Sequence, residues 1–386
     1  MPQTDPIALL QALIRCPSVT PDTAGVLDVL AGALAPLGFA VTRQRFTGDG
    51  SYTVDNLFAT RGSSGPHLLF AGHTDVVPPG DPAAWTHPPF EAVEADGRIY
   101  GRGAADMKSG IAAFVAAAAG AIADGSAERG RLSLLITNDE EADAINGTEK
   151  LLAWARASGH SFDFAIVGEP SSASRVGDSI KVGRRGSLNA ELVVTGVQGH
   201  VAYPDKAANP LPLLARLVAA LSGPLDAGSA DFPPSNLEFT SIEVGNSASN
   251  VIPGRAAGRL NVRYNDRWTP ETLLAALNER VAAVPAPPRM AAALQVLGRP
   301  SRSFVSPRGG GVALLAEVIA EVTGRPPELS TGGGTSDARF IAPYCPVAEL
   351  GLVGTSMHQV DEQVAIADVR ALTGLYQAFI SRFLRG

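Results

Sequence analysis

Residues 67–75, HLLFAGHTD, begin as an unbroken apolar run and end on a histidine and an aspartate. A short apolar run bounded by turn-forming residues is typical of a strand buried on both faces, as in a parallel sheet. Three more runs have this form: LSLLI (132–136), FAIVG (164–168) and VAELGLVG (347–354). Between the first two runs, the Ala-rich stretch after Lys108 has the composition of a helix, with Asp106 near its start, where an acid is favourable. Strands that alternate with helices predict an α/β domain with a mostly parallel central sheet flanked by helices.

The middle of the chain has a different pattern. SLNAELVVTG (187–196) and AAGRLNVRYN (256–265) alternate apolar and polar residues, as strands buried on one face do. Between them, NPLPLLARLVAALSG (209–223) has the apolar spacing of a helix after a proline-rich start. We therefore predict a smaller α+β domain inserted at 183–298, with residues 1–182 and 299–386 forming the α/β domain.

Composition narrows the class of protein. The chain has 386 residues and a formal net charge of −7, which argues against nucleic acid or an anionic membrane as the main partner. The N-terminus carries an acid and prolines where a signal peptide needs basic residues, and the apolar runs are too short to span a membrane. Cys16 and Cys345 make neither a disulfide framework nor a cysteine-based zinc site. We expect a cytoplasmic protein.

Each of the four apolar runs is followed by residue types that bind metal ions. In chain order these are His73 with Asp75, then Glu140 with Glu141, then Glu169, then His358, and Asp106 precedes the Ala-rich helix. Ligands of open α/β sheets bind beyond the carboxyl ends of the strands, so we expect these side chains to converge on one crevice. Two imidazoles with several carboxylates suit zinc, manganese or cobalt. The chain has no HExxH motif, which excludes the simplest mononuclear metalloprotease.

The adjacent acids Glu140 and Glu141, within TNDEEAD (137–143), need an explanation because like charges repel strongly near a protein interior. A solvated loop is one interpretation. The other is a pair of metal ions sharing one carboxylate. Neighbouring residues near a strand end point to opposite sides, so one glutamate can bind a metal while the other carries the proton of the reacting water. Asp75 is placed to accept the second ring N–H of His73, although a buried structural histidine beside a turn-capping aspartate is an alternative.

Several motifs together resemble the M20 family of dinuclear zinc amidohydrolases and exopeptidases. They are GHTDVVPPGDPAAWTHPPFEA (72–92), YGRGAADMKSGIAA (100–113), TNDEEADAINGT (137–148), VGEPSS (167–172), GRRGS (183–187), GHVAYP (199–204), NVIPG (250–254) and TGGGTSDARF (331–340). The resemblance covers about residues 7 to 385. The longer stretches 169–187 and 199–210 resemble the branch that cleaves N-succinyl-L,L-2,6-diaminopimelate to succinate and L,L-2,6-diaminopimelate, in lysine and cell-wall precursor biosynthesis.

The resemblance implies two zinc ions per subunit, with cobalt as a substitute, and a role for each ligand-type residue. His73 and Glu169 would hold one ion, Glu141 and His358 the other, with Asp106 bridging both; Glu140 would be the general base, and Asp75 would orient His73. His200, in the inserted domain, would reach the active site of the partner subunit in a homodimer and stabilise the oxyanion. The inserted domain would then be the dimerisation or lid domain.

A carboxylated N-acyl amino acid substrate needs cationic partners. Arg184 and Arg185 of GRRGS and Arg263 of NVRYN are the candidates, because guanidinium pairs with carboxylate in bidentate fashion. A surface charge or an ion pair between domains is the alternative for each arginine. The resemblance favours Arg184, Arg263 and also Asn250. In STGGGTSDARF (330–340) the glycines would let backbone N–H groups approach a carboxylate, with Thr335 as the contact residue.

Two other functions stay open from the sequence. One is an acetylornithine deacetylase or aminoacylase with the same metal site. The other is a metal-binding protein that has lost turnover, and the presence of Glu140 argues against it. Some relatives have an asparagine near the position of Gly354, so a substrate contact by that side chain is absent here.

Overall fold

A computed structural model of the chain describes residues 4–385, which divide into two compact units. The first unit contains the residues up to Val182, Ser306–Ser330 and the residues from Ser336 onward. The second unit contains Gly183–Val305 and the short segment Thr331–Thr335.

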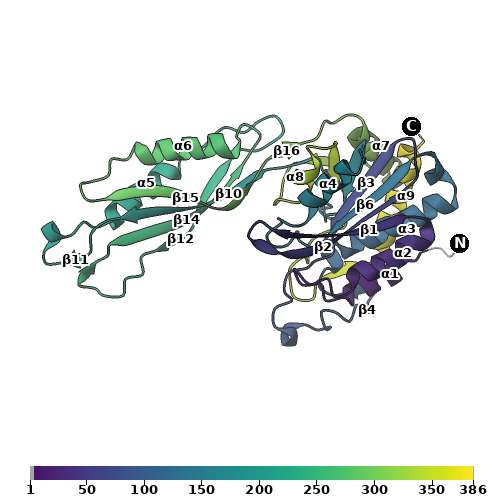
Figure 1. The fold of residues 1–386 in the computed structure, drawn as a ribbon, viewed down its shortest axis with the longest axis horizontal. Helices are drawn as coiled ribbons and strands as arrows, with labels where there is room; N and C mark the ends of the chain where they lie inside the picture. The colour runs from purple at the N-terminus through teal and green to yellow at the C-terminus, as the bar shows by residue number, and fades with distance from the viewer. Residues whose placement is uncertain (1–3, 386) are drawn as a thin grey trace. The chain divides into compact units, whose positions relative to one another are not determined.

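An eight-stranded sheet forms the centre of the first unit, in the order β1-β2-β6-β3-β7-β18-β8-β17 (Figure 1). The strands are β1 (Ala40–Gly48), β2 (Ser51–Arg61), β3 (His67–His73), β6 (Arg131–Thr137), β7 (Phe164–Val167), β8 (Ser179–Lys181), β17 (Glu328–Ser330) and β18 (Val347–Glu349). The four neighbours β6, β3, β7 and β18 are mutually parallel, whereas β1, β2 and β8 join antiparallel neighbours. This arrangement confirms the predicted α/β class with a mostly parallel central sheet.

The last of the predicted strands is shorter than expected, because β18 ends at Glu349 and the prediction for residues 350–354 was wrong. After β18 the chain runs beside the loop that follows β7, and the N–H of Leu350 donates to Val167 O at 3.0 Å. Gly351 approaches this loop so closely that a Cβ would lie 2.2 Å from Glu169 O. Residues 350–354 therefore line the Glu169 loop instead of extending the sheet.

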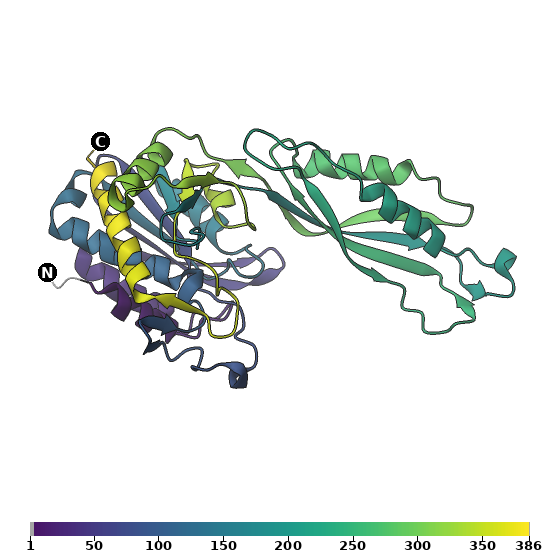
Figure 2. The same cartoon turned by 180° about the vertical axis from the view of Figure 1, so that it is seen from behind.

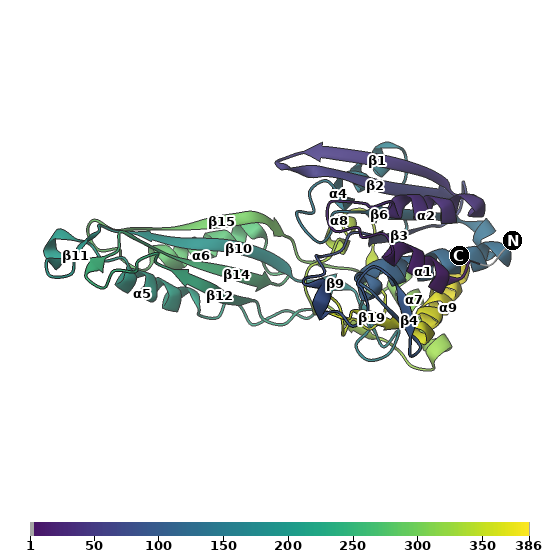
Figure 3. The same cartoon turned by 90° about the horizontal axis from the view of Figure 1, so that it is seen from below.

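Five helices cover one face of the sheet, and Figures 2 and 3 show them from two further sides. They are α1 (Pro6–Ile14), α2 (Val26–Leu34), α3 (Ser109–Ala123), α7 (Gly311–Thr323) and α9 (Ile366–Phe383). The opposite face carries α4 (Thr148–Ala157) beside α8 (Ala338–Ile341), and Trp154 of α4 lies edge-on to Phe58 of β2. The parallel strands are thus buried on both faces, as their continuous apolar runs predict.

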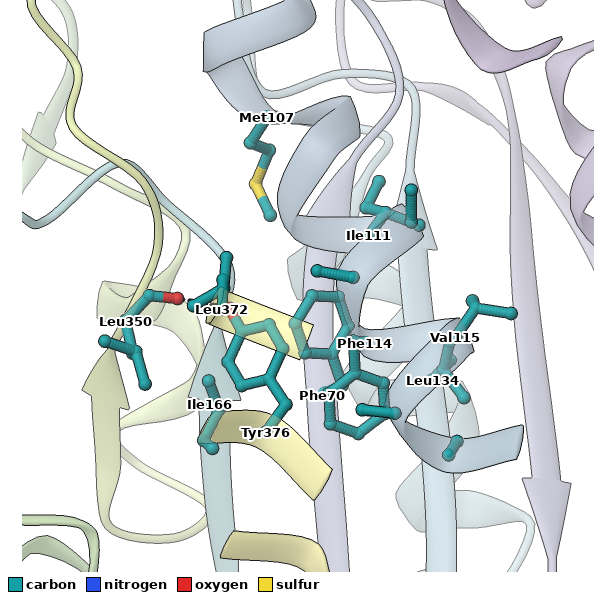
Figure 4. Packing of buried hydrophobic residues seen from close by; sticks show 14 of the residues in the cluster. Phe70, Met107, Ile111, Phe114, Val115, Leu134, Ile166, Leu350, Leu372 and Tyr376 are labelled. Carbon is teal, nitrogen blue, oxygen red and sulfur yellow. Dashed lines mark hydrogen bonds between the residues drawn. The ribbon is translucent and has the colours of Figure 1, made fainter. Parts of the chain in front are cut away.

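Aromatic rings fix α3 and α9 against the sheet (Figure 4). Phe70 of β3 stacks on Phe114 of α3 with ring centroids 4.2 Å apart, and Tyr376 of α9 meets Phe70 edge-on at 5.9 Å. Full burial of each such side chain contributes about 1.5–3 kcal/mol. The stretch Ala104–Ala123 is long and apolar enough by composition to span a membrane, yet it is buried in this core.

A small three-stranded sheet lies at the edge of the first unit. It consists of β4 (Val93–Ala95), β5 (Arg98–Tyr100) and β19 (Gln363–Ala365), in the order β19-β5-β4. The pairing of Gln363 with Tyr100 joins two segments that are far apart in the chain. It brings the end of the loop that contains His358, between β18 and β19, next to the segment that leads from β5 to the turn at Asp106.

The second unit is an antiparallel four-stranded sheet in the order β12-β14-β10-β15, with two helices on one face. Its elements are β10 (Gly186–Thr195), α5 (Leu211–Leu221), β12 (Asn236–Glu243), β14 (Arg255–Tyr264), α6 (Pro270–Ala282) and β15 (Ala291–Ser301). Two short ribbons accompany the sheet: β9 (Gly183–Arg184) with β16 (Phe304–Val305), and β11 (Gly199–His200) with β13 (Val251–Ile252). Within this unit β11 lies at the opposite end of the sheet from the start of β10 (Figure 1). The α+β character matches the predicted pattern, while its role in dimerisation stays a prediction.

Candidate metal centre

The carboxyl ends of the four parallel strands carry the ligand-type residues. His73 is the last residue of β3, the Glu140–Glu141 pair follows β6, Glu169 follows β7, and His358 follows β18 after a longer loop. Asp106 lies in the turn before α3, with φ −123° and ψ 102°, so it is not part of the helix. The N-cap position of α3 is Lys108, so the helix begins directly after Lys108 as predicted, and Asp106 lies two residues before this N-cap.

One group of possible metal ligands consists of His73, Asp106 and Glu169. His73 Nε2 lies 3.2 Å from Asp106 Oδ1 and 3.6 Å from Glu169 Oε1. One ligand atom from each residue lies within 4.8 Å of the other two, and all three residues are buried. The space between them therefore suits a single small cation.

A second group consists of Asp106, Glu141 and His358. His358 Nε2 lies 3.0 Å from Glu141 Oε1 and 3.4 Å from Asp106 Oδ2. Asp106 thus presents Oδ1 to one histidine and Oδ2 to the other. The two groups share this carboxylate, which is the arrangement that a bridging ligand requires.

The carboxylates of the two ligand groups favour positive charge at the histidines and in the space between the ligands. Hydrogen bonds with the Asp106 and Glu141 carboxylates raise the pKa of His358 to about 10. Burial lowers the pKa of His73, but the carboxylates of Asp106, Asp75 and Glu169 raise it well above its ordinary value. Burial raises the pKa of Asp106, and the two histidines more than reverse that effect. The carboxylates thus attract cations, whether imidazolium protons or a dication.

The carboxylate of Asp75 contacts the acid pair more closely than it contacts the His73 ring. It accepts the N–H of Glu140 at 3.1 Å and of Glu141 at 3.0 Å, and the hydroxyl of Thr20 at 2.9 Å. His73 Nδ1 lies 3.0 Å from the backbone oxygen of Asp75 but 3.6 Å from its carboxylate. The backbone oxygen therefore fixes the ring, and the side chain fixes the loop after β6.

Glu140 and Glu141 have different surroundings, as predicted, but not because they alternate along a strand. β6 ends at Thr137, and both glutamates lie in an irregular loop. Glu141 contacts His358, whereas burial raises the pKa of Glu140 well above its ordinary value; His73 opposes this rise, and the carboxylates of Asp337, Glu169 and Glu141 add to it. Glu140 is thus an acid with an enhanced affinity for a proton.

The remaining candidate residues belong to the second unit and form two separate sets. His200 and Asn250 lie together at the β11–β13 ribbon, where Asn250 O accepts the N–H of Val201 at 3.1 Å. His200 is exposed, and its Nδ1 accepts the N–H of Ala202 at 3.1 Å. The other set lies near the start of β10.

Arg184 is buried and its guanidinium lies against the glycine segment. Its Nη1 donates to Gly332 O at 3.4 Å and to Gly334 O at 3.3 Å. A Cβ on Gly333, whose φ is +106°, would lie 2.3 Å from that nitrogen. The glycines therefore bring carbonyl oxygens to Arg184; the approach of their N–H groups to a substrate carboxylate, with Thr335 as the contact, stays a prediction.

Arg263 lies on β14 opposite Ser187 of β10, at the same end of the sheet as Arg184. Burial lowers the pKa of the half-buried Arg263, and the nearby charge of Arg185 lowers it further. Arg185 donates to Asn236 Oδ1 at 2.9 Å. The two neighbouring guanidinium groups repel each other, so a bound carboxylate would relieve that repulsion.

Sequence interpretation missed Glu362 and Arg102. Both are buried and form an ion pair in which Arg102 Nη1 lies 2.7 Å from Glu362 Oε2. Glu362 also accepts the backbone N–H of Asp106 at 3.2 Å. The one signal in the sequence is an acid only four residues after His358, which by itself resembles a surface charge.

Comparisons with known proteins agree on one family. Residues 69–382 match the profile of peptidase family M20/M25/M40. A succinyl-diaminopimelate desuccinylase of Rhodopseudomonas palustris (strain TIE-1) is 54% identical over 379 residues, which cover 98% of each chain. A second, from Bradyrhizobium sp. (strain BTAi1 / ATCC BAA-1182), is 53% identical over 382 residues, covering 98% of this chain and 99% of the relative.

Among solved structures, the M20 family metallo-carboxypeptidase Sso-CP2 from Sulfolobus solfataricus matches with a TM-score of 0.79. The match covers 99% of this chain and 100% of that chain, at 17% sequence identity. At such low identity the match shows a shared fold alone.

Proposed function

The chain belongs to peptidase family M20/M25/M40, and we propose that it is a dinuclear metal amide hydrolase that cleaves N-succinyl-L,L-2,6-diaminopimelate to succinate and L,L-2,6-diaminopimelate. The observation that carries this proposal is the pair of ligand groups that share Asp106. The relatives quoted above carry the desuccinylase name at 53–54% identity, so deacetylation of acetylornithine is not favoured.

The donor set fits two zinc ions, with cobalt as a substitute. Each group offers one imidazole nitrogen and two carboxylate residues, a combination that zinc and cobalt accept. His73 and Glu169 would hold one ion, Glu141 and His358 the other, and Asp106 both. Bound there, the ions would lower the pKa of a water molecule towards neutrality and polarise the substrate carbonyl.

Glu140 would move the proton in the reaction. Its carboxylate takes a proton from water as the water oxygen attacks the amide carbon of the succinyl group. The C–N bond then breaks, and Glu140 returns the proton to the leaving amine, so the base is regenerated in each cycle.

The arginines at the start of β10 would select the succinyl substrate. A succinyl group ends in a carboxylate that an acetyl group lacks, and guanidinium groups bind carboxylates in bidentate geometry. Arg184 and Arg263 would supply this contact, with Thr335 adding a hydrogen bond. The charge repulsion between Arg185 and Arg263 supports an anion-binding role for that end of the sheet.

The length of β10 supports a homodimer in which His200 and Asn250 act on the substrate of the partner subunit. Arg263 is paired with Ser187, whereas His200 lies beyond Thr195 at the other end of β10. A strand from Ser187 to Thr195 spans about 26 Å at ~3.3 Å per residue, which is longer than the substrate. One second unit therefore does not offer both sets to a single substrate molecule, which is why we assign the two sets to different subunits.

His200 has the tautomer that an oxyanion requires. Because its Nδ1 accepts the N–H of Ala202, the neutral ring carries its proton on Nε2. That N–H would donate to the oxygen of the tetrahedral intermediate, the position at which negative charge develops. Asn250 lies beside it on the same ribbon and would add a second hydrogen bond.

A paired hydrolysis assay tests the proposal. Full-length protein is stripped with a chelator, reloaded with zinc, and supplied with N-succinyl-L,L-diaminopimelate or N-acetylornithine. We expect zinc to restore activity, with a strong preference for the succinyl substrate. A preference for acetylornithine would reject the substrate but keep the metal chemistry, and no turnover of either with two ions bound would reject the amidase.

A further inference from the structure

We propose that Glu362 is a positioning residue of the metal centre, which holds the Asp106 turn and the His358 loop together so that Asp106 can bridge two ions. The inference rests on the proposed dinuclear function and deepens it, because it names a residue that would set metal affinity without touching a metal.

On one side, Glu362 binds the backbone of the turn that presents Asp106. Its Oε1 accepts the N–H of Ala105 at 2.8 Å and of Asp106 at 3.2 Å. Its Oε2 accepts the N–H of Gly103 at 3.1 Å. Three backbone donors thus converge on one carboxylate, and the Asp106 backbone cannot shift without breaking at least one of these bonds.

On the other side, Arg102 connects the same carboxylate to the His358 loop. Its Nη1 donates to Glu362 Oε2 at 2.7 Å and to Gln359 O at 3.2 Å. Its Nη2 donates to His358 O at 3.4 Å, and Trp85 covers the guanidinium with its ring centroid 5.2 Å away. The pair therefore connects the backbones of Asp106 and His358, two of the three residues of the second ligand group.

The conformation of His358 explains why its loop needs such support. Its φ is +61°, a left-handed value that costs free energy for a residue other than glycine and persists only where the surroundings enforce it. Arg102 bonds the carbonyl of that residue, and Glu362 O also accepts the N–H of Gly101 at 2.8 Å. The loop geometry that aims His358 at Asp106 is thus enforced from the Glu362 side.

Burial makes this arrangement sensitive to substitution. Glu362 is 0% and Arg102 is 3% exposed, so neither can replace a lost partner with water. Glutamine at position 362 would keep the size of the side chain, but its amide group would present N–H atoms to backbone N–H donors. It would also leave the Arg102 charge without a counter-ion. Since Asp106 belongs to both ligand groups, the displacement would affect both ions.

The test measures metal binding rather than turnover. Full-length wild-type and Glu362→Gln proteins are stripped of metal, checked for folding by circular dichroism, and titrated with Zn²⁺ against a chromogenic chelator. We expect wild type to bind two ions and Glu362→Gln to lose at least about tenfold in affinity, the range typical of residues that orient ligands. The visible absorption of the Co²⁺-loaded variant should also change, because it reports ligand geometry.

Asp226→Asn is the matched control. The Asp226 carboxylate also accepts several N–H donors, among them Trp268 Nε1 at 2.7 Å and Gly228 N at 2.8 Å, but it belongs to the second unit and to neither ligand group. This variant should lose thermal stability and keep wild-type zinc affinity. The same result for Glu362→Gln, with an unchanged Co²⁺ spectrum, would overturn the proposal.

Arg102→Lys decides the question if Glu362→Gln does not fold. Lysine keeps the positive charge, but one nitrogen cannot bond Glu362, Gln359 O and His358 O at the positions of the guanidinium nitrogens. A tenfold loss of affinity supports the proposal, and wild-type affinity overturns it. Fewer than two ions in the wild-type protein would instead overturn the dinuclear function itself, before any variant is compared.

Discussion

The carboxylate of Asp75 accepts the backbone N–H of Glu141 at 3.0 Å, so a residue of the loop after β3 sets the position of the acid pair after β6. It accepts the N–H of Glu140 as well, at 3.1 Å. The Asp75 carboxylate thus binds the N–H groups of two consecutive residues, and the side chains of these two glutamates extend towards different neighbours. The histidine of the same loop, His73, needs only the backbone oxygen of Asp75 for its orientation.

Asp75→Asn should therefore disturb the acid pair. An asparagine offers one acceptor where the carboxylate offers two, and its NH₂ group would oppose the incoming N–H donors. We expect kcat to fall by about 10–100-fold with a parallel loss of zinc affinity, as for other residues that orient ligands. Thr20→Val is the control, since it removes only the 2.9 Å hydroxyl bond to Asp75 and should have a much smaller effect. Equal effects in the two variants would contradict the anchoring of the glutamates.

Substitution of Glu140 should affect mainly turnover, whereas substitution of Glu141 should affect mainly metal binding. Glu140→Ala should keep two ions per chain and lose about 10²–10⁴-fold in kcat, the usual contribution of a general base. Glu141→Ala should weaken metal binding, because it removes the carboxylate that lies 3.0 Å from His358 Nε2. Metal content after gel filtration and turnover at saturating zinc distinguish the two effects. If Glu140→Ala loses metal while Glu141→Ala retains it, the two roles are reversed.

The strands that carry the site could be predicted because the apolar pattern that marks each of them lies within the strand itself. β3, β6 and β7 are continuous apolar runs between turn-forming residues, and such runs indicate buried parallel strands without any knowledge of their neighbours. The residues at the ends of these strands could therefore be assigned to one edge of the sheet. That assignment led to His73, Glu169 and the acid pair.

The supporting contacts were not predictable, because they join segments far apart in the chain through backbone atoms. Glu362 binds the backbone of Asp106, and Arg184 binds the carbonyl of Gly334, and no pattern in the sequence marks a backbone atom as a partner. The early end of β18 has the same cause, since Gly351 follows the backbone of Glu169 instead of the sheet. Such contacts depend on the tertiary path of loops, whose sequences have no period.

The glycine segment beside Arg184 provides a specific test of substrate selection. Gly333→Ala would place a methyl group 2.3 Å from Arg184 Nη1, at a backbone φ of +106° that alanine disfavours. We expect a KM for the succinyl substrate raised by about tenfold, the equivalent of one weakened charge-assisted hydrogen bond, at unchanged metal content. Gly334→Ala is the control, because its methyl group would meet no atom within 4 Å. Steady-state kinetics of both variants check the expectation, and a KM raised equally in both would contradict it.

His67 should make the stability of the protein depend on pH below neutrality. Its Nδ1 donates to Ser161 O at 2.6 Å and its Nε2 lies 2.8 Å from Ser133 Oγ. Burial, with a smaller effect from Arg131, lowers its pKa to about 4. An unfolded chain takes up the proton below about pH 6.5, whereas the folded chain takes it up only near pH 4. The contribution of neutral His67 is therefore present above pH 6.5 and is lost as the pH falls towards 4.

Urea unfolding of wild type and His67→Gln at several pH values, with equal metal load, measures this contribution. The free energy of unfolding of wild type should fall more steeply between pH 6.5 and 4, by up to about 1 kcal/mol per pH unit relative to the variant. Parallel curves for wild type and His67→Gln would show that the buried ring does not couple folding to pH.

Mixed dimers test the proposed homodimer and the proposal that His200 acts across subunits. Glu140→Ala and His200→Ala homodimers should each be nearly inactive, because each lacks one group at both sites. In a heterodimer of the two variants, one active site carries both lesions, while the other combines an intact Glu140 with the intact His200 of the partner subunit. Purified heterodimers, separated by two different affinity tags, should therefore regain about half of wild-type activity per dimer, since one of the two sites is complete. If His200 acted on its own subunit, one heterodimer site would lack Glu140 and the other would lack His200, so activity would not return. That result would contradict the inference drawn from β10, which separates His200 from Arg263 within one second unit.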